Sequence, residues 1–348
     1  MKRYLLLPTL FMLCACFGAA ESLLLNPAEL HYFHGEEMFP LRKVAEFAGY
    51  LVHYIPGEIT LTSPQKELYL NLKDGLLVAN GHRVFLWPEP CLIDSVCYVP
   101  VNFLQDHLRL DVKSAHGQYE IVKAAENQLQ IKNETVTYTD QYLNVQMQYP
   151  QVDGLPLDVQ KLVNSAVEEK VTALKKTVFS DREGLLTDPP RIPYDYYLNY
   201  LVKRNRDNIL SILFEDYYFT GGAHGIGYKF AFNFDLETGR QYTLPDLFAP
   251  EVNYIAFLNE QINEQIAKSN FELDYYWFES IAQDQVFYFT ADALVICFQS
   301  YEIAPYAAGK PEFAISFSQL EEILHPRLRE RLKYVIGHSL IHSLNISR

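Results

Sequence analysis

The sequence predicts an α+β protein of two modules, a duplicated small α/β stalk domain and a C-terminal antiparallel sheet packed with helices. An internal repeat with an offset of 60 residues occupies residues 22–124. Beyond it, long amphipathic helices alternate with strand-like runs, as in α+β domains. The 25 Tyr and 22 Phe gather in these runs, which is typical of sheets with one partly exposed face.

The first 20 residues have the pattern of a signal peptide. Lys2 and Arg3 precede an apolar run that ends in small residues, and the first acidic residue is Glu21. Cys16 ends a stretch that resembles the lipobox of bacterial lipoproteins, so that Cys16 would be lipidated, whereas cleavage after Ala20 would free the protein. An uncleaved apolar anchor is a third reading. We expect an extracytoplasmic protein, secreted or attached to the membrane through a lipid anchor.

Charge narrows the choice of ligand. The chain has a net charge of −14, which disfavours nucleic acid and anionic lipid because both are bound through Lys and Arg contacts to phosphate. Such a surface suits a cationic partner, although solubility alone also explains it.

The cysteines outside the signal peptide leave one question open. Cys91 and Cys97 flank a short stretch, and a three-residue turn at residues 93–95 would set them opposite each other on a hairpin, where they could form a disulfide. The alternative is two small apolar strand residues. Cys297 is expected in a buried strand.

The repeat aligns residues 39–53 with residues 99–113. In each copy Pro40 or Pro100 opens a short helix with its apolar residues on one face, and a strand pair follows. Between the copies, residues 76–86 form a hairpin around Asn80 and Gly81.

This pattern resembles the copper amine oxidase N-terminal-like domain, a stalk module of bacterial envelope proteins. The second copy departs from the family by carrying Asn102 in place of Arg and Arg109 in place of Gly. The resemblance implies no copper centre, and the histidines show no shared ligand spacing, so we expect no metal and no cofactor.

In the second module, periodicity predicts helices and strands from residue 136 on. One helix is expected to begin at Ser318, where Ser318 and Glu321 have the spacing of a capping box. The other expected elements are strands at 136–149, 196–203, 209–219, 228–235 and 286–298, the last folding back at 290–292, and helices at 157–179 and 252–268.

Two loops are the candidate binding site. Residues 217–227 contain four glycines between two strands, and residues 301–309 place two tyrosines and a proline beside a small-residue bend. Glycine permits close approach of another backbone, and rigid aromatic side chains are common binding anchors. The residues expected to bind ligand are Tyr218, Thr220, Gly221, Gly222, His224, Gly225, Tyr301, Pro305 and Tyr306.

Residues 196–324 resemble the extracytoplasmic domain of the RsiV anti-sigma factor, a family also found in peptidoglycan deacetylases. The motifs include Tyr218 to Gly225, Asn233 to Gly239 and Tyr301 to Gly309, and residues 135–195 resemble the domain that usually precedes it. The resemblance implies binding of lysozyme. We therefore expect modules at 22–124, 135–195 and 196–330, followed by a helical tail at 331–348.

Two function classes follow. The favoured one is a non-enzymatic envelope protein that binds lysozyme or peptidoglycan, because no motif assembles a nucleophile, a base and an orienting acid. The alternative is a cell-wall hydrolase in which His224 acts as base beside Asp216, Asp235 or Glu302. A zinc site at His338 and His342 is disfavoured, since the helix lacks the Glu and third ligand of zinc helices.

Overall fold

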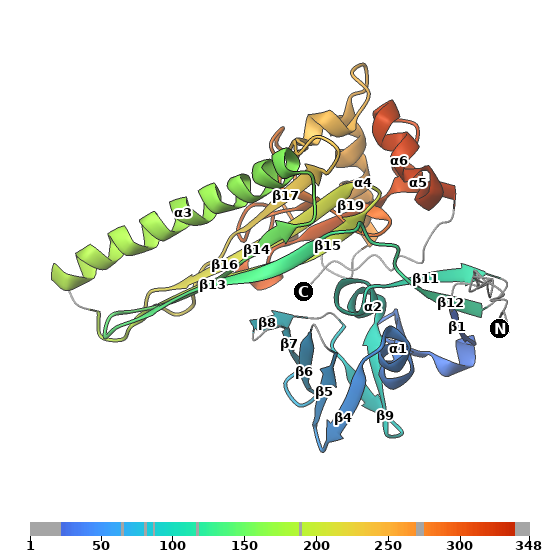
Figure 1. Ribbon diagram of the computed structural model, residues 1–348, viewed down its shortest axis with the longest axis horizontal. Coiled ribbons are helices and arrows are strands. Elements are labelled where there is room, and N and C mark those ends of the chain that lie inside the picture. Colours follow the sequence, from blue (N-terminus) through green and yellow to red (C-terminus); the bar gives the residue numbers. More distant parts are fainter. Residues whose placement is uncertain are drawn as a thin grey trace, which may run out of the picture.

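Figure 1 shows the computed structural model, which confirms the α+β class and the stalk module. The structure describes residues 22–63, 66–79, 82–85, 88–115, 118–187, 190–268 and 275–337. The predictions on the signal peptide, Cys16, the turn at Asn80 and Gly81, and His338 and His342 lie outside the described residues.

The stalk module folds into three small sheets around one core. Helices α1 and α2 pack against the sheets through residues such as Val44 and Leu104, which are fully buried. Its elements are β1 (Ser22–Leu25), η1 (Pro27–Glu29), β2 (His31–Phe33), β3 (Glu36–Pro40), α1 (Leu41–Ala48), β4 (Leu51–Ile55), β5 (Glu58–Thr62), β6 (Glu67–Asn71), β7 (Leu76–Ala79), β8 (His82–Phe85), β9 (Cys91–Ile93), β10 (Val96–Pro100), α2 (Val101–Leu108), β11 (Leu110–Ala115) and β12 (Gln118–Lys123).

The two copies of the repeat face each other across a local two-fold axis. Strands β3 and β10 pair antiparallel at the centre of a sheet ordered β2-β3-β10-β9. Phe39 lies opposite Val99 in this pair, and these two residues are equivalent in the 60-residue repeat. The repeat therefore gives the central sheet of the stalk a local two-fold symmetry.

Arg109 explains why the second copy dispenses with glycine at the end of its helix. Gly49 ends α1 in the left-handed conformation with φ 95°, and Arg109 ends α2 in the same region with φ 57°. A side chain there costs about 1 kcal/mol. The Arg109 guanidinium offsets this cost by donating to the carbonyl oxygen of Val202 at 2.7 Å in the second module.

Of the two readings left open for Cys91 and Cys97, the disulfide is wrong, and the structure has two strand residues with free thiols. The hairpin turns on two residues, Asp94 and Ser95, both with positive φ, and not on three. Cys97 therefore lies opposite Leu92, and Cys91 lies opposite Tyr98. Because a shift of one residue sends side chains to the other face, the two thiols point to opposite sides of the sheet, and both are free.

The second module is a stack of four layers. Helix α3 covers one face of the long five-stranded sheet, a three-stranded sheet packs on its other face, and α4, α5 and α6 cover the far side. Its elements are β13 (Gln130–Thr139), β14 (Leu143–Asp153), α3 (Leu157–Thr187), β15 (Tyr194–Arg206), β16 (Ile209–Phe219), β17 (Lys229–Asp235), η2 (Leu244–Leu247), α4 (Tyr254–Lys268), β18 (Phe287–Phe289), β19 (Ala293–Cys297), η4 (Tyr306–Ala308), β20 (Glu312–Ser316), α5 (Phe317–Leu320) and α6 (Pro326–Gly337).

The strand predicted at 136–149 is two strands. The chain reverses at Asp140, whose carboxylate accepts the main-chain N–H groups of Tyr142 and Leu143 at 2.8 and 2.9 Å. Strands β13 and β14 then pair over ten residues. Strand β14 also pairs with β15 in parallel, so the sheet is mixed. Parallel neighbours need a crossover connection, and α3 provides it.

The cap predicted at Ser318 is also wrong by two residues. Ser316 caps α5, its hydroxyl accepting the main-chain N–H of Gln319 at 3.3 Å, while the Gln319 side chain accepts the N–H of Ser316 at 3.1 Å. Both serines fit the capping pattern. Helix α5 begins at Phe317, whose ring is fully buried in the core, so the cap falls on Ser316.

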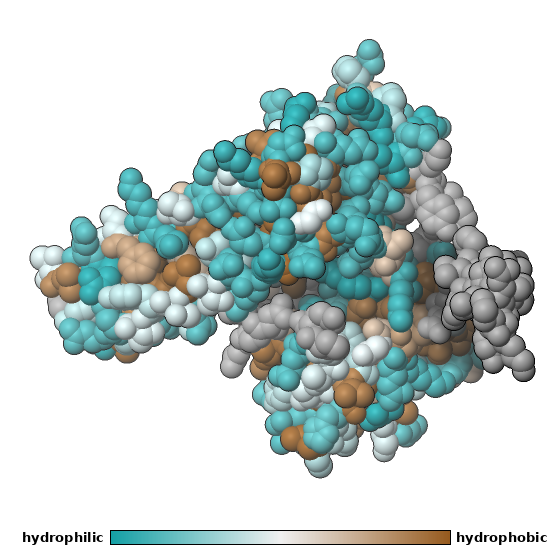
Figure 2. Space-filling model, in the orientation of Figure 1, coloured by the Kyte–Doolittle hydropathy of each residue, from teal (hydrophilic) through white to brown (hydrophobic). Residues whose placement is uncertain are grey.

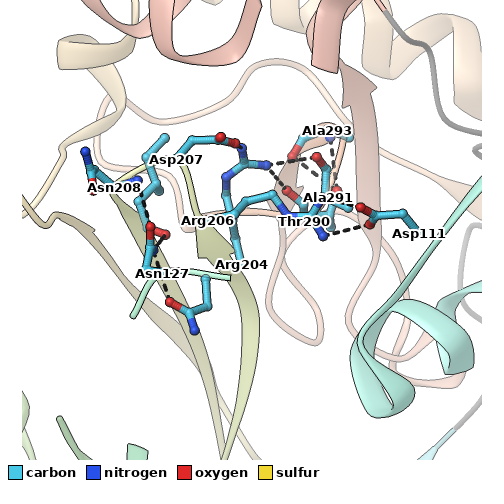
Figure 3. A network of polar contacts seen from close by, with 11 residues as sticks. Asp111, Asn127, Arg204, Arg206, Asp207, Asn208, Thr290, Ala291 and Ala293 are labelled. Carbon is cyan, nitrogen blue, oxygen red and sulfur yellow. Dashed lines mark hydrogen bonds and ion pairs between the residues drawn. The ribbon is translucent and has the colours of Figure 1, made fainter. Parts of the chain in front are cut away.

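The modules meet through charged groups. Arg206 on β15 makes two hydrogen bonds of 2.7 Å to the carboxylate of Asp111 on β11, and Lys203 pairs with Asp106 on α2. Asn127, between the modules, donates its main-chain N–H to the carbonyl oxygen of Asn205 at 3.0 Å. These contacts fix the stalk against β15, and Figure 3 shows the pair of Arg206 and Asp111.

Arg204 ties the turn after β15 to the three-stranded sheet. Its guanidinium is fully buried and donates to the carbonyl oxygens of Thr290 and Ala291 at 2.8 and 2.9 Å, while it pairs with Asp207. Figure 3 shows these groups next to the Asp111 contact. Burial lowers the pKa of Arg204 to about 10, so it stays charged at neutral pH.

Candidate functional site

The two predicted loops lie together in the structure. The hydroxyl of Tyr306 donates to the carbonyl oxygen of Gly225 at 2.9 Å, and its ring stacks on His224 with centroids 4.0 Å apart and planes at 21°. Tyr301 follows, 5.6 Å from Tyr306. We call His224, Tyr301 and Tyr306 the aromatic ledge.

The ledge is accessible to a ligand. Tyr301 is 51% exposed, His224 is exposed and Tyr306 is half-buried. Tyr301 also has φ 69°, a conformation that is uncommon for a bulky residue and that is often found at functional sites.

The loop of residues 217–227 is held rigidly on the sheet beneath it. The main chains of Tyr218 and Ile226 exchange hydrogen bonds of 2.7 and 2.9 Å, and the Tyr217 hydroxyl accepts the N–H of Gly225 at 3.1 Å. A Cβ on Gly225 would overlap the Tyr217 ring, and one on Gly227 would overlap the carbonyl oxygen of Asp216. Gly225 and Gly227 therefore allow the loop to pack closely against the sheet, and this packing holds His224 in place.

The other predicted residues have different places. The ring of Tyr218 faces the α3 side of the sheet, with centroids 6.0 Å from those of both Tyr194 and Tyr196, so it is not part of the ledge. Thr220, Gly221 and Gly222 are exposed on the loop. Pro305 is the N-cap residue of η4 and directly precedes Tyr306.

Trp277 is a member of the site that the sequence did not reveal. It is 50% exposed, its indole N–H donates to the carbonyl oxygen of Glu302 at 3.0 Å, and its main-chain N–H donates to Ile303 at 2.9 Å. It is therefore bound to the two residues that follow Tyr301 in the chain. The rarity of Trp in this chain, 2 residues in all, was the available signal.

Two acidic side chains near the ledge are paired with lysines. Lys310 pairs with Glu215, and Lys229 lies 2.8 Å from Glu312. Burial raises the pKa of Asp216, whose carboxylate accepts the N–H of Tyr228 at 2.7 Å. These ion pairs and hydrogen bonds therefore offset part of the negative charge of Glu215, Glu312 and Asp216.

His224 lacks an orienting acid among its three candidates. Its Nδ1 lies 2.9 Å from the carbonyl oxygen of Gly225, and because a carbonyl only accepts, Nδ1 carries the proton. The carboxylate of Asp235 pairs with Arg331 at 3.0 Å, that of Glu302 accepts from Gln299 and Gln285 at 2.6 and 2.9 Å, and that of Asp216 is bound as described. A base of the Ser-His-Asp kind needs such an acid.

Neither a metal site nor a membrane span is found in the described part of the chain. Its His, Cys, Asp and Glu side chains form no group of three or more that could hold a metal ion. Its helices include none with the length and apolar character needed to cross a membrane.

Comparison with known proteins confirms the module order expected from the sequence. Residues 25–123 match the family model of the copper amine oxidase N-terminal domain, residues 136–227 that of deacetylase PdaC, and residues 245–318 that of a protein of unknown function, DUF3298. The peptidoglycan-N-acetylmuramic acid deacetylase PdaC of Bacillus subtilis (strain 168) is 24% identical over 257 residues. The match covers 70% of this chain and 51% of the deacetylase, so the chain spans about half the length of that relative.

Two solved structures of the DUF3298 family are similar to the chain. One, from Bacteroides fragilis NCTC 9343, has a TM-score of 0.45 at 19% identity and covers 61% of this chain and 98% of its own. The other, from Pseudomonas aeruginosa PAO1, has a TM-score of 0.43 at 19% identity, with coverages of 59% and 96%.

Proposed function

We propose that this protein is a non-enzymatic binding protein of the cell envelope whose aromatic ledge binds the glycan strand of peptidoglycan. The observation that carries the proposal is the aromatic ledge, in which Tyr306 stacks on His224 and the exposed Tyr301 lies next to Tyr306, while Trp277 bonds the neighbouring Glu302. Flat rings that are open on one face and rigidly held can stack on the apolar face of a sugar ring and lose little conformational entropy on binding.

Two other observations support a glycan in preference to a cationic protein such as lysozyme. Two lysine–carboxylate pairs near the ledge offset part of the local negative charge that would attract a basic enzyme. The similar deacetylase is named for its action on peptidoglycan. In this proposal the signal peptide exports the chain, and lipidation of Cys16 would keep it at the membrane.

Co-sedimentation of the purified protein with insoluble peptidoglycan tests the proposal. We expect binding that weakens about tenfold when Tyr301 is replaced by Ala, since one stacked ring contributes about 1 kcal/mol or more. Tyr54→Ala is the matched control, because Tyr54 is 45% exposed but lies on β4 of the stalk.

Three results would overturn the proposal. The first is retention of peptidoglycan binding by Tyr301→Ala and Tyr306→Ala together, with the fold intact by circular dichroism. The second is binding to lysozyme with none to peptidoglycan, which would favour the protein ligand. The third is turnover of cell-wall substrates that disappears in His224→Ala, which would establish the hydrolase.

A further inference from the structure

Strand β13 has an outer edge with which no other strand of the described chain pairs. Its order in the sheet is β13-β14-β15-β16-β17, which leaves one side open. The main-chain N–H of Asp140 donates to the carbonyl oxygen of Leu143 at 3.0 Å. Because hydrogen-bonded and non-hydrogen-bonded residue pairs alternate along an antiparallel ladder, this bond shows which residues of β13 bond to β14. Even-numbered residues of β13 bond to β14, and the main-chain groups of five residues point outward: Ile131, Asn133, Thr135, Thr137 and Thr139.

The other free edges of this module are closed by specific hydrogen bonds. The parallel pairing of β14 with β15 ends at Met147, which leaves the later part of this side of β14 without a partner strand. There the Asn164 side chain of α3 accepts the N–H of Val152 and donates to its carbonyl oxygen, each at 2.9 Å. On β15, Arg109 and Asn127 bond the carbonyl oxygens of Val202 and Asn205 at 2.7 and 3.0 Å.

The same holds for the edges of β17, β18 and β20. Gln299 bonds both main-chain groups of Lys229 on β17, each at 2.9 Å. Ser211 accepts the N–H of Phe289 on β18 at 3.0 Å, and Gln265 donates to Ala314 on β20 at 2.9 Å. Proteins close exposed edges because open ones pair with other strands, so the open edge of β13 stands out.

The composition of β13 does little to prevent pairing. The strand contains no proline, and its charged residues are Lys132 and Glu134, both exposed. The remainder is mainly Thr, Asn, Val and Tyr, which favour strands or tolerate them. Figure 2 shows a largely hydrophilic face with hydrophobic residues in small separate groups, so main-chain hydrogen bonds, and not a large apolar patch, would drive association here.

We propose that β13 pairs with β13 of a second copy of this chain, antiparallel across a two-fold axis at Asn133. In this register Asn133 meets its own equivalent through outward-pointing groups, and Lys132 lies opposite Glu134 of the second copy. The symmetry repeats this ion pair on the other side of the axis. In the two neighbouring registers Lys132 or Glu134 would face its own equivalent, and like charges directly opposite each other disfavour pairing.

Lys132 is available for this exchange. In the single chain its Nζ lies 2.9 Å from Asp153, and the two side chains are 60% and 52% exposed. Such surface pairs contribute little to stability. Lys132 can therefore turn toward the second copy at small cost.

Sedimentation velocity of the purified protein over a wide concentration range tests the proposal. We expect a dimer that dissociates on dilution. Lys132→Glu places like charges opposite each other twice, so the dissociation constant should rise about tenfold or more. The combined variant Lys132→Glu and Glu134→Lys restores opposite charges and should restore the dimer.

A proline variant gives an independent test. Asn133→Pro removes an N–H that β14 does not use, and proline is tolerated on edge strands for this reason. We expect this variant to be monomeric, with unchanged circular dichroism and a thermal midpoint close to that of the parent. A parent protein that stays monomeric at every concentration overturns the proposal. So does a dimer that survives Asn133→Pro or a charge swap that does not restore pairing.

Discussion

At the scale of single residues, the loop that carries His224 depends on contacts beneath it. Gly227 passes so close to β16 that a Cβ would overlap the carbonyl oxygen of Asp216. A main-chain atom within a sheet cannot move away as the end of a flexible side chain can. Gly222, five residues earlier, has only one atom near such a Cβ, at 3.8 Å.

We therefore expect Gly227→Ala to destabilise the fold by about 1–3 kcal/mol, the usual cost of forcing an atom into packed structure. Gly222→Ala should change the free energy of unfolding by less than about 0.5 kcal/mol. Denaturant unfolding followed by circular dichroism measures both. Equal effects of the two substitutions would contradict the packing role given to Gly227.

Lys66 is a residue whose charge depends on the fold. It is half-buried beside the junction of the modules, and its Nζ donates to the carbonyl oxygen of His107 at 3.2 Å. Burial, together with the charge of Arg109, lowers the pKa of Lys66 from 10.5 to about 7. Between these two values the unfolded chain holds a proton that the folded chain has released.

The free energy of unfolding should therefore rise with pH from about 7 toward 10 through Lys66, by up to about 1 kcal/mol per pH unit. Below about pH 7 this contribution is constant, because both states are then protonated. Lys66→Met should lose this slope. Unfolding curves of the parent and the variant at pH 7, 8 and 9 provide the measurement, and parallel pH profiles would contradict the assignment.

The members of the ledge could be predicted from the sequence only in part. Glycine and tyrosine cluster in the two loops that carry Tyr301, Tyr306 and His224, and this clustering is visible in the sequence. The sequence does not show that the ring of Tyr218 packs against Tyr194 and Tyr196 of another strand, away from these three side chains. Trp277 was missed because only the fold brings it beside Glu302.

At the scale of elements, the helices and most strands were predictable because their periodicity is local. The errors arose where the chain reverses direction and the alternation of residues along the two strands continues through the turn. The alternation of β13 continues into β14 through the turn at Asp140, so the two strands look like one. The hairpin of Cys91 and Cys97 was expected with a turn one residue too long, and that single residue decides whether two thiols meet.

Edge closure is a property of elements that the sequence did not show. Asn164, Gln265 and Gln299 look like ordinary polar residues in the sequence, yet each one bonds the main chain of a strand. Their roles depend on which strand lies beside them. The open edge of β13 becomes visible only by comparison with these closed ones.

At the scale of the whole molecule, the junction holds the stalk against the second module. The carboxylate of Asp111 and the guanidinium of Arg206 are 10% and 15% exposed and bond at 2.7 Å. Removing one member of a buried pair leaves an uncompensated charge, which costs about 3–5 kcal/mol. Periodicity says nothing of such a contact, since the two residues are 95 positions apart.

Asp111→Ala should therefore loosen the junction and expose residues 124–129 to protease. The combined variant Asp111→Ala and Arg206→Met should recover much of the lost stability, because it leaves no unpaired charge. Glu46→Ala, which breaks an exposed pair on α1, is the control and should have little effect. Rates of proteolysis and thermal unfolding report on both modules, and resistance of Asp111→Ala to protease would contradict this role of the junction.

The two-fold arrangement of the stalk has a consequence for its origin. Because Phe39 lies opposite its own equivalent Val99, each half of the module presents β3 or β10 as a strand whose natural mate is another copy of itself. A polypeptide with a single half would have to find that mate in a separate molecule. The stalk thus has the geometry of an ancestral homodimer whose subunits have become covalently continuous.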